Sequence, residues 1–194
     1  EEDILSVLDG LERQELEPWA EAKELGELVE NPPAAGRIVS RNSIDGTDIL
    51  DWRLSNGARV LVLPTSLRSD EVLFRAVSPG GASLVSDERY LSAQFAVDAV
   101  AEGGLADYSV DDLRRLLTGK NVEVSSFIYE TYEGLSGSAS TGDLETLLQL
   151  AYLHQTAIRR DEVAWDALMT RMNENLKNRD SSPRTLYSDL LWKT

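Results

Sequence analysis

The residue pair Asn56-Gly57 constrains the fold more than any other feature, because it lies between two short runs that are typical of β-strands. The run Ile49–Leu54 alternates apolar and polar residues before it, and the apolar run Val60–Leu63 follows it up to Pro64. Both residues of an Asn-Gly pair tolerate positive φ, which the favoured hairpin turns require. The sequence therefore predicts an antiparallel hairpin at this point.

Apolar periodicity and turn residues predict the remaining elements in chain order. A third strand, a helix of alternating apolar and polar faces and a short helix with a capping-box pattern come first, followed by two strands and three helices. These elements are expected at Val72–Val77, Glu88–Gly104, from Ser109, at Asn121–Tyr129, Tyr132–Ser138, Asp143–Ile158, Asp161–Lys177 and from Ser182-Pro183. Strands and helices grouped in this way predict an α+β fold, with a mainly antiparallel sheet and helices layered on one face.

The first part of the chain has a different character. Residues 1–30 read as helical, with Pro18 opening a second helix that runs through Leu25 and Leu28. The run Asn31–Gly36 contains two prolines and a glycine, so it predicts a linker, and Arg37–Ser40 follows as a short extended piece.

Charge and composition exclude several classes of function. The net charge is −15, with 34 acidic and 19 basic residues, which repels phosphate backbones and anionic lipids. No nucleic-acid partner is expected. No run reaches the roughly 18 to 20 apolar residues of a membrane span, so no membrane insertion is expected. Zero cysteines exclude disulfides and thiolate chemistry and leave the compartment open. An acidic start and an amphipathic finish favour a segment of a longer polypeptide.

Single residues with catalytic potential have simpler structural interpretations. His154 is the only histidine and lies between Leu150 and Ile158 at helical spacing, which favours a packing or surface role. Ser136 is not in a G-x-S-x-G motif, so a nucleophilic serine is not indicated. Trp52, Trp165 and Tyr152 fall on apolar faces and are expected in the core.

The glycine pairs and carboxylate pairs in the sequence do not indicate a specific function either. The glycine pairs Gly80-Gly81 and Gly103-Gly104 lack the spacing of a phosphate-binding loop and are expected at a turn and a helix end. In a chain this acidic, the carboxylate pairs are expected to be solvated surface. These pairs are Asp111 with Asp112 and Glu130 with Glu133. The residues alone therefore indicate an acidic α+β domain without a recognisable catalytic motif.

Several stretches resemble domains of the pitrilysin and insulinase family of zinc metallopeptidases. The run Trp52–Pro64 is similar to the opening hairpin of these domains, and Ser78–Ser83 is similar to the following turn of their non-catalytic repeats. Four later stretches match in the same order, namely Gly119-Lys120, Glu133–Ser138, Asp143–Leu150 and Arg179–Pro183. The resemblance implies that residues 1–48 are a helical linker from a preceding repeat and that residues 49–194 are a non-catalytic metallopeptidase-like domain, truncated at its C-terminus.

In catalytic repeats of this family, the helix after the third strand carries H-x-x-E-H, whose histidines bind zinc and whose glutamate activates water; a distant carboxylate completes the site. With the glycine at the helix end as the register mark, the run Phe95–Ala99 occupies these positions, and Glu174 or Asn175 occupies the distal one. Phe95 and Ala99 replace the histidines. Asp98 keeps a carboxylate at the position of the glutamate, but without zinc ligands there is no metal-bound water for it to activate. The resemblance therefore implies no catalytic, cofactor-binding or metal-binding residue here.

The same resemblance implies a function for the parent polypeptide. The segment is expected to pair with a catalytic repeat of the same chain, which would hold the zinc, and to help enclose peptide substrates in a chamber. Export to the periplasm or beyond is expected, as in long bacterial relatives. The alternative is a structural or interaction subunit without peptidase activity, like the family's relatives in a respiratory complex. The apolar residues Leu190, Leu191 and Trp192 could also drive self-association of the segment.

Overall fold

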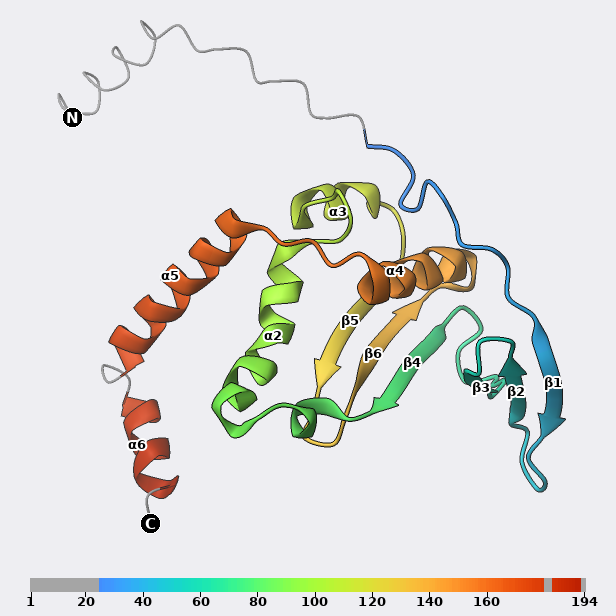
Figure 1. Ribbon diagram of the computed structural model, residues 1–194, viewed down its shortest axis with the longest axis horizontal. Coiled ribbons are helices and arrows are strands. Elements are labelled where there is room, and N and C mark those ends of the chain that lie inside the picture. The colour runs from blue at the N-terminus through green and yellow to red at the C-terminus, as the bar shows by residue number, and fades with distance from the viewer. Residues whose placement is uncertain (1–24, 180–182, 193–194) are drawn as a thin grey trace, which may run out of the picture.

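The computed structural model describes residues 25–179 and 183–192. Within this part of the chain the strands and helices follow one another in an α+β order (Figure 1). The strands are β1 (Ile38–Ser43), β2 (Leu50–Leu54), β3 (Arg59–Val62), β4 (Val72–Pro79), β5 (Val122–Ile128) and β6 (Tyr132–Ala139). The helices are α2 (Tyr90–Gly103), α3 (Val110–Leu116), α4 (Leu144–Thr156), α5 (Glu162–Asn178) and α6 (Pro183–Trp192), and short 3-10 turns occupy Gly81–Leu84, Asp87–Arg89 and Thr141–Asp143.

The predicted hairpin is confirmed as β2 and β3. They pair antiparallel, and Gly57 in the turn has φ 87°, a value that favours glycine. The Asn56 side chain accepts a hydrogen bond from the Ala58 amide at 3.1 Å, which fixes the turn locally. Strand β1 pairs antiparallel with β2, so the three strands form a small sheet in the order β1-β2-β3, which we call the meander.

The second sheet has the order β4-β6-β5 and is also antiparallel. The central strand β6 is rich in glycine because its neighbours approach closely. A Cβ atom at Gly134 would collide with the carbonyl oxygen of Ala76 on β4, and one at Gly137 would collide with that of Glu123 on β5. The two glycines therefore permit the spacing of this sheet.

Helices cover one face of the second sheet. Side chains on that face are buried or half-buried, and helix α4 lies against β5 and β6 while α2 lies against β5. The core forms between α4 and the sheet, where Leu147 is 0 % exposed and Leu150, Leu153, Leu105 and Leu135 are at most 5 % exposed. On the other face Leu73 is 75 % exposed. The predicted α+β class, with an antiparallel sheet and helices, is confirmed.

Residues 25–37, the described part of the chain ahead of the meander, contain no helix. Residues 25–31 are irregular, so the predicted helix through Leu25 and Leu28 is wrong over this part; Leu28 and Val29 pack against the core from this irregular segment. The Tyr108 hydroxyl donates a hydrogen bond to the Glu27 carbonyl at 2.9 Å. The helix predicted over residues 1–24 lies outside the described residues, as does Ser182. The domain boundary at residue 48 stays a prediction, and β1 lies on its N-terminal side.

Two further expectations need correction. The helix predicted from Glu88 begins at Tyr90, after the 3-10 turn Asp87–Arg89. Leu91 in the first turn of this helix is 76 % exposed. Trp52, Trp165 and Tyr152 were expected in the core, but Trp52 is only half-buried, and the exposed fractions of Trp165 and Tyr152 are 43 % and 37 %.

Candidate functional site

Helix α2 carries the positions at which the sequence resemblance locates a metal-binding motif. Phe95 lies against Trp165 of α5, with ring centroids 5.9 Å apart and planes inclined at 70°, an edge-to-face contact. Ala96 and Val97 line a cavity towards the second sheet, whereas Asp98 is exposed. The aromatic contact therefore fixes α2 against α5 at the place where the first histidine would stand.

The distal carboxylate position lies on α5. Glu174 forms an ion pair with Lys177 at 2.8 Å on its own helix, and both side chains are exposed. One turn earlier, Arg171 reaches across to Glu102 of α2 at 2.6 Å. Within residues 25–179 and 183–192, no group of three or more histidine, cysteine, aspartate or glutamate side chains is close enough to hold a metal ion.

Cavities lie on both sides of α2. One of 360 Å³ is lined by Ala99, Val100, Ile158, Trp165 and the run Arg159–Glu162, between α2 and the start of α5. Another of 280 Å³ lies between α2, β5 and α4 and is mostly apolar, with Leu150 and His154 among its lining residues. The first cavity has no hydroxyl or imidazole in its lining. The second has Ser126 next to His154, but its one carboxylate, Glu123, is on the face of β5 opposite to that of Ser126 and does not complete a triad with them.

His154 is half-buried on α4 and faces the β5 strand. Its Nδ1 atom is 3.2 Å from the Ser126 hydroxyl. Burial lowers the pKa of the imidazole below 6.5, and a hydrogen bond with the backbone of Val124 opposes that shift. The predicted packing role fits this position, since the ring lies among the apolar side chains between α4 and the sheet.

Ser136 does not lie near His154. Its hydroxyl is 3.3 Å from that of Ser125, on the open face of the sheet, whereas Ser126 is the next residue of β5 and points to the covered face. A Ser-His arrangement from the sequence-predicted candidates therefore does not form.

The paired residues have structural roles. Gly81 has φ 62°, and a Cβ there would collide with the Tyr129 backbone, while Gly104 ends α2 with φ 85°. The turn and helix-end roles predicted for the two glycine pairs are confirmed. Asp112 completes a capping box with Ser109, whose amide is 3.2 Å from the Asp112 carboxylate.

A cluster on the open face of the second sheet was missed by sequence reasoning. The rings of Phe127, Tyr129 and Tyr132 lie 4.8 to 6.0 Å apart, and the Arg75 guanidinium lies 5.0 Å from the centre of the Phe127 ring. Alternate aromatic residues on one strand, with a third across a tight turn, were the available signal.

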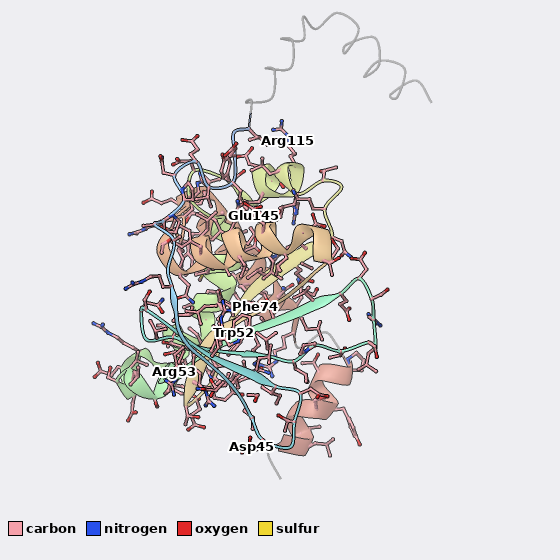
Figure 2. All side chains as sticks on the ribbon, turned by 90° about the vertical axis from the view of Figure 1, so that its right-hand side faces the viewer. Asp45, Trp52, Arg53, Phe74, Arg115 and Glu145 are labelled. Carbon is pink, nitrogen blue, oxygen red and sulfur yellow. The ribbon has the colours of Figure 1, made fainter. Side chains whose placement is uncertain are left out.

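The meander lies apart from the helices. Figure 2, in which the meander faces the viewer, shows the tip of the meander at Asp45 far from Glu145 on α4 and Arg115 on α3.

The chain is similar in sequence to known proteins and in fold to solved structures. No family model matches the chain. A probable zinc protease PqqL of Haemophilus influenzae is 27 % identical over 132 residues, which cover 68 % of this chain and 14 % of that protein. A PQQL-like zinc protease of Arabidopsis thaliana is 26 % identical over 188 residues, which cover 96 % of this chain and 17 % of that protein. The chain thus spans less than a fifth of these curated relatives.

Two solved structures share the fold. The periplasmic protease PqqL from Escherichia coli superimposes with a TM-score of 0.72 at 22 % identity, covering 98 % of this chain and 21 % of that one. A variant of the ferredoxin protease FusC, in complex with Arabidopsis ferredoxin, superimposes with a TM-score of 0.73 at 23 % identity, covering 99 % and 21 %. Among the described residues, no helix has the length and apolar character needed to cross a bilayer.

Proposed function

We propose that this chain, whose relatives and structural neighbours are PqqL-like zinc proteases of the pitrilysin and insulinase family, forms a non-catalytic part of such a protease. In this proposal zinc and the attacking water belong to a catalytic repeat elsewhere in the same polypeptide. The present chain packs against that repeat and forms part of the wall of a chamber that encloses the peptide substrate.

The side-chain chemistry of α2 carries the proposal. Zinc in proteins is held by nitrogen, sulfur or carboxylate oxygen atoms, and neither the phenyl ring of Phe95 nor the methyl group of Ala99 offers one. Phe95 is also engaged with Trp165, and Asp98 is exposed to solvent. The residues at these positions do not fit a zinc ion, so we assign no hydrolytic step to this chain.

The same relatives support a proposal for the partners and the compartment. The structural neighbours are proteases, one of them a periplasmic protease and the other in complex with a ferredoxin. We propose peptides or unfolded proteins as the substrates of the parent enzyme, the catalytic repeat as the partner of this chain, and export as its destination. A surface with a net charge of −15 supports the absence of nucleic acid among these partners.

Metal content and peptidase activity of the purified chain test the proposal directly. We expect substoichiometric zinc and no chelator-sensitive cleavage of an unstructured peptide. The double substitution Phe95→His and Ala99→His is the matched control, because it places two imidazoles one helical turn apart and should raise zinc affinity measurably. Stoichiometric zinc in the unmodified chain, or cleavage that a chelator abolishes, would refute the proposal.

The sequence of the full translated product distinguishes the peptidase role from the structural alternative. A catalytic role for the parent polypeptide requires H-x-x-E-H outside these residues. If the full translated product lacks that motif, a structural or interaction role replaces the chamber role, and the fold described above is unaffected.

A further inference from the structure

Two adjoining cavities lie beneath α2, between this helix, α4 and the second sheet. The outer cavity has a volume of 470 Å³ and the inner cavity a volume of 280 Å³. Their linings share four residues, so the two cavities meet there: Val97, Val100, Ser126 and His154. A cavity of about 15 Å³ already holds one water molecule, and protein interiors contain few larger voids. The space beneath α2 is therefore large enough for a small organic ligand.

The side chains that α2 directs towards the sheet are too small to fill this space. The residues of α2 and its C-cap that line the two cavities are Ala96, Val97, Val100, Ala101 and Gly104. They recur at steps of three and four and so share one side of the helix. The bulkier ring of Phe95 lies on another side, against Trp165 of α5. The sequence of α2 thus explains why the cavities form.

Exposure decreases from the outer cavity to the inner one. In the lining of the outer cavity, Ser78 and Gln155 are exposed, and Ile158 is 55 % exposed. In the lining of the inner cavity, Leu105 is 3 % and Leu150 is 4 % exposed. A ligand would therefore enter through the outer cavity and place its least polar part in the inner one.

The inner cavity has the chemistry of an apolar binding site. Ser126 and His154 lie 3.2 Å apart and interact with each other. Glu123 and Ser125 also belong to the lining, but their side chains lie on the opposite face of β5. An engineered apolar cavity of about 150 Å³ stays dry and binds benzene. A cavity of 280 Å³ therefore suits a benzene ring that carries a short chain.

The outer cavity contributes one carboxylate, that of Glu133. This residue precedes the buried Leu135 by two positions on β6, so its side chain lies on the helix-covered face, where it is half-buried. Its side chain makes no hydrogen bond or ion pair with the described residues. A half-buried carboxylate favours a cationic partner, and the net charge of −15 attracts cations to the whole molecule.

We infer that the cavities beneath α2 bind a small amphipathic amine, with its apolar body in the inner cavity and its protonated amino group beside Glu133. The His154 imidazole and the Ser126 hydroxyl lie where the two cavities meet and can hydrogen-bond a polar group of the ligand. The inference goes beyond the proposed function and does not depend on it, because the metal-motif positions Phe95 and Ala99 lie towards α5.

Titration of the purified chain with phenethylamine tests the binding. Phenethyl alcohol has the same apolar body with a neutral head, and ethylamine has the same head without the ring. We expect millimolar or tighter binding of phenethylamine, about fivefold weaker binding of the alcohol and no binding of ethylamine. Calorimetry and the rise of the thermal unfolding midpoint both measure this. Absence of phenethylamine binding, or equal affinity for the amine and the alcohol, would overturn the inference.

Removal of the carboxylate tests the position of the amino group. Glu133→Gln should weaken phenethylamine binding to the level of the alcohol and leave the affinity for the alcohol unchanged. The matched control is Glu130→Gln, because Glu130 is exposed and lines neither cavity. This control should change neither affinity. Equal losses in the two variants would assign the binding to general attraction by the acidic surface and contradict the inference.

Filling the space where the cavities meet tests the position of the apolar body. Val97→Phe should abolish binding of the amine and the alcohol without lowering the unfolding midpoint, because the added ring occupies empty space. Val97→Leu is the milder variant should the first not fold, and it should weaken binding about threefold. Val163→Phe, at an 80 % exposed position of α5, is the matched control and should bind as the parent does. Undiminished binding by the Val97 variants would refute the inference.

The histidine ring signals in a proton NMR spectrum locate the ligand independently. His154 is the only histidine of the chain, so its imidazole resonances need no further assignment. They should shift on addition of phenethylamine and stay in place with ethylamine. Binding of phenethylamine without such a shift would place the ligand elsewhere and overturn the inference.

Discussion

The meander and the second sheet are built from similar strands, yet only one of them has a core. Both are three-stranded and antiparallel, and both alternate half-buried and exposed residues. The second sheet is covered by α2 and α4 and contains the buried side chains of Leu135 and Ala139, whereas none of the meander's described residues is buried. Alternation therefore specifies a strand, but burial depends on what packs against it.

The largest difference in stability is expected between variants in which one leucine of each region is replaced by alanine. Leu147 on α4 is 0 % exposed, and Leu147→Ala should destabilise the chain by about 2–5 kcal/mol through lost burial and a residual cavity. Leu61 in the meander is 53 % exposed, so Leu61→Ala should cost less than about 1 kcal/mol. Urea denaturation of the two variants checks this, and equal losses would mean that the meander is packed in solution.

The next largest loss of stability is expected where strands β4 and β6 lie close together. Gly134→Ala forces a methyl group against the Ala76 carbonyl of the neighbouring strand and should destabilise by about 1–3 kcal/mol. Gly36→Ala, just before the meander, meets only the Ser55 hydroxyl at 3.7 Å and should stay within about 0.5 kcal/mol of the parent. Thermal unfolding of both variants measures the difference, and a neutral Gly134→Ala would contradict the observed spacing of β4 and β6.

A smaller effect should follow protonation of His154, which lies only in the packed region. Burial lowers the pKa of its imidazole below the 6.5 of an exposed ring, so the unfolded state binds more protons between the two values. Stability should therefore fall as the pH drops below 6.5 towards the lowered pKa. Denaturation midpoints above and below that pH measure the slope, and His154→Gln should flatten it. An unchanged slope in this variant would assign the effect to carboxylates.

The smallest effect is expected from the ion pair on the meander. Asp51 accepts a bidentate hydrogen bond from Arg59 across β2 and β3, which lowers the pKa of the Asp51 carboxyl. The pair lies at the surface of the meander, with the Arg59 side chain 47 % and the Asp51 side chain 18 % exposed, so Asp51→Asn should change the unfolding transition only slightly. Addition of salt should then have little influence on the difference between variant and parent. A marked loss of stability would show that the meander contributes more than its contacts indicate.

Sequence reasoning predicted the strands, the hairpin and most of the helices because their signals are local. Asn56-Gly57, the Ser109 capping box and the glycine at the end of α2 each act within a few residues. It failed where distant segments decide the outcome. Leu25 and Leu28 have helical spacing, but Leu28 packs on α4 from an irregular segment.

The candidate site was predictable to a smaller extent. The residues at the metal-motif positions can be read from a resemblance, but the contact of Phe95 with Trp165 joins positions far apart in the chain and leaves no local signal. The same holds for Arg75 over Phe127, which depends on the register of three strands. Division of the strands into two sheets also depends on register and has no counterpart in the local pattern.

The edge-to-face contact between Phe95 and Trp165 has a practical consequence. Because Trp165 is partly solvated and is held against α2 by that ring, its indole emission is a built-in optical reporter of whether α5 stays docked. A variant that keeps Trp165 as its sole tryptophan would follow this docking in real time during refolding.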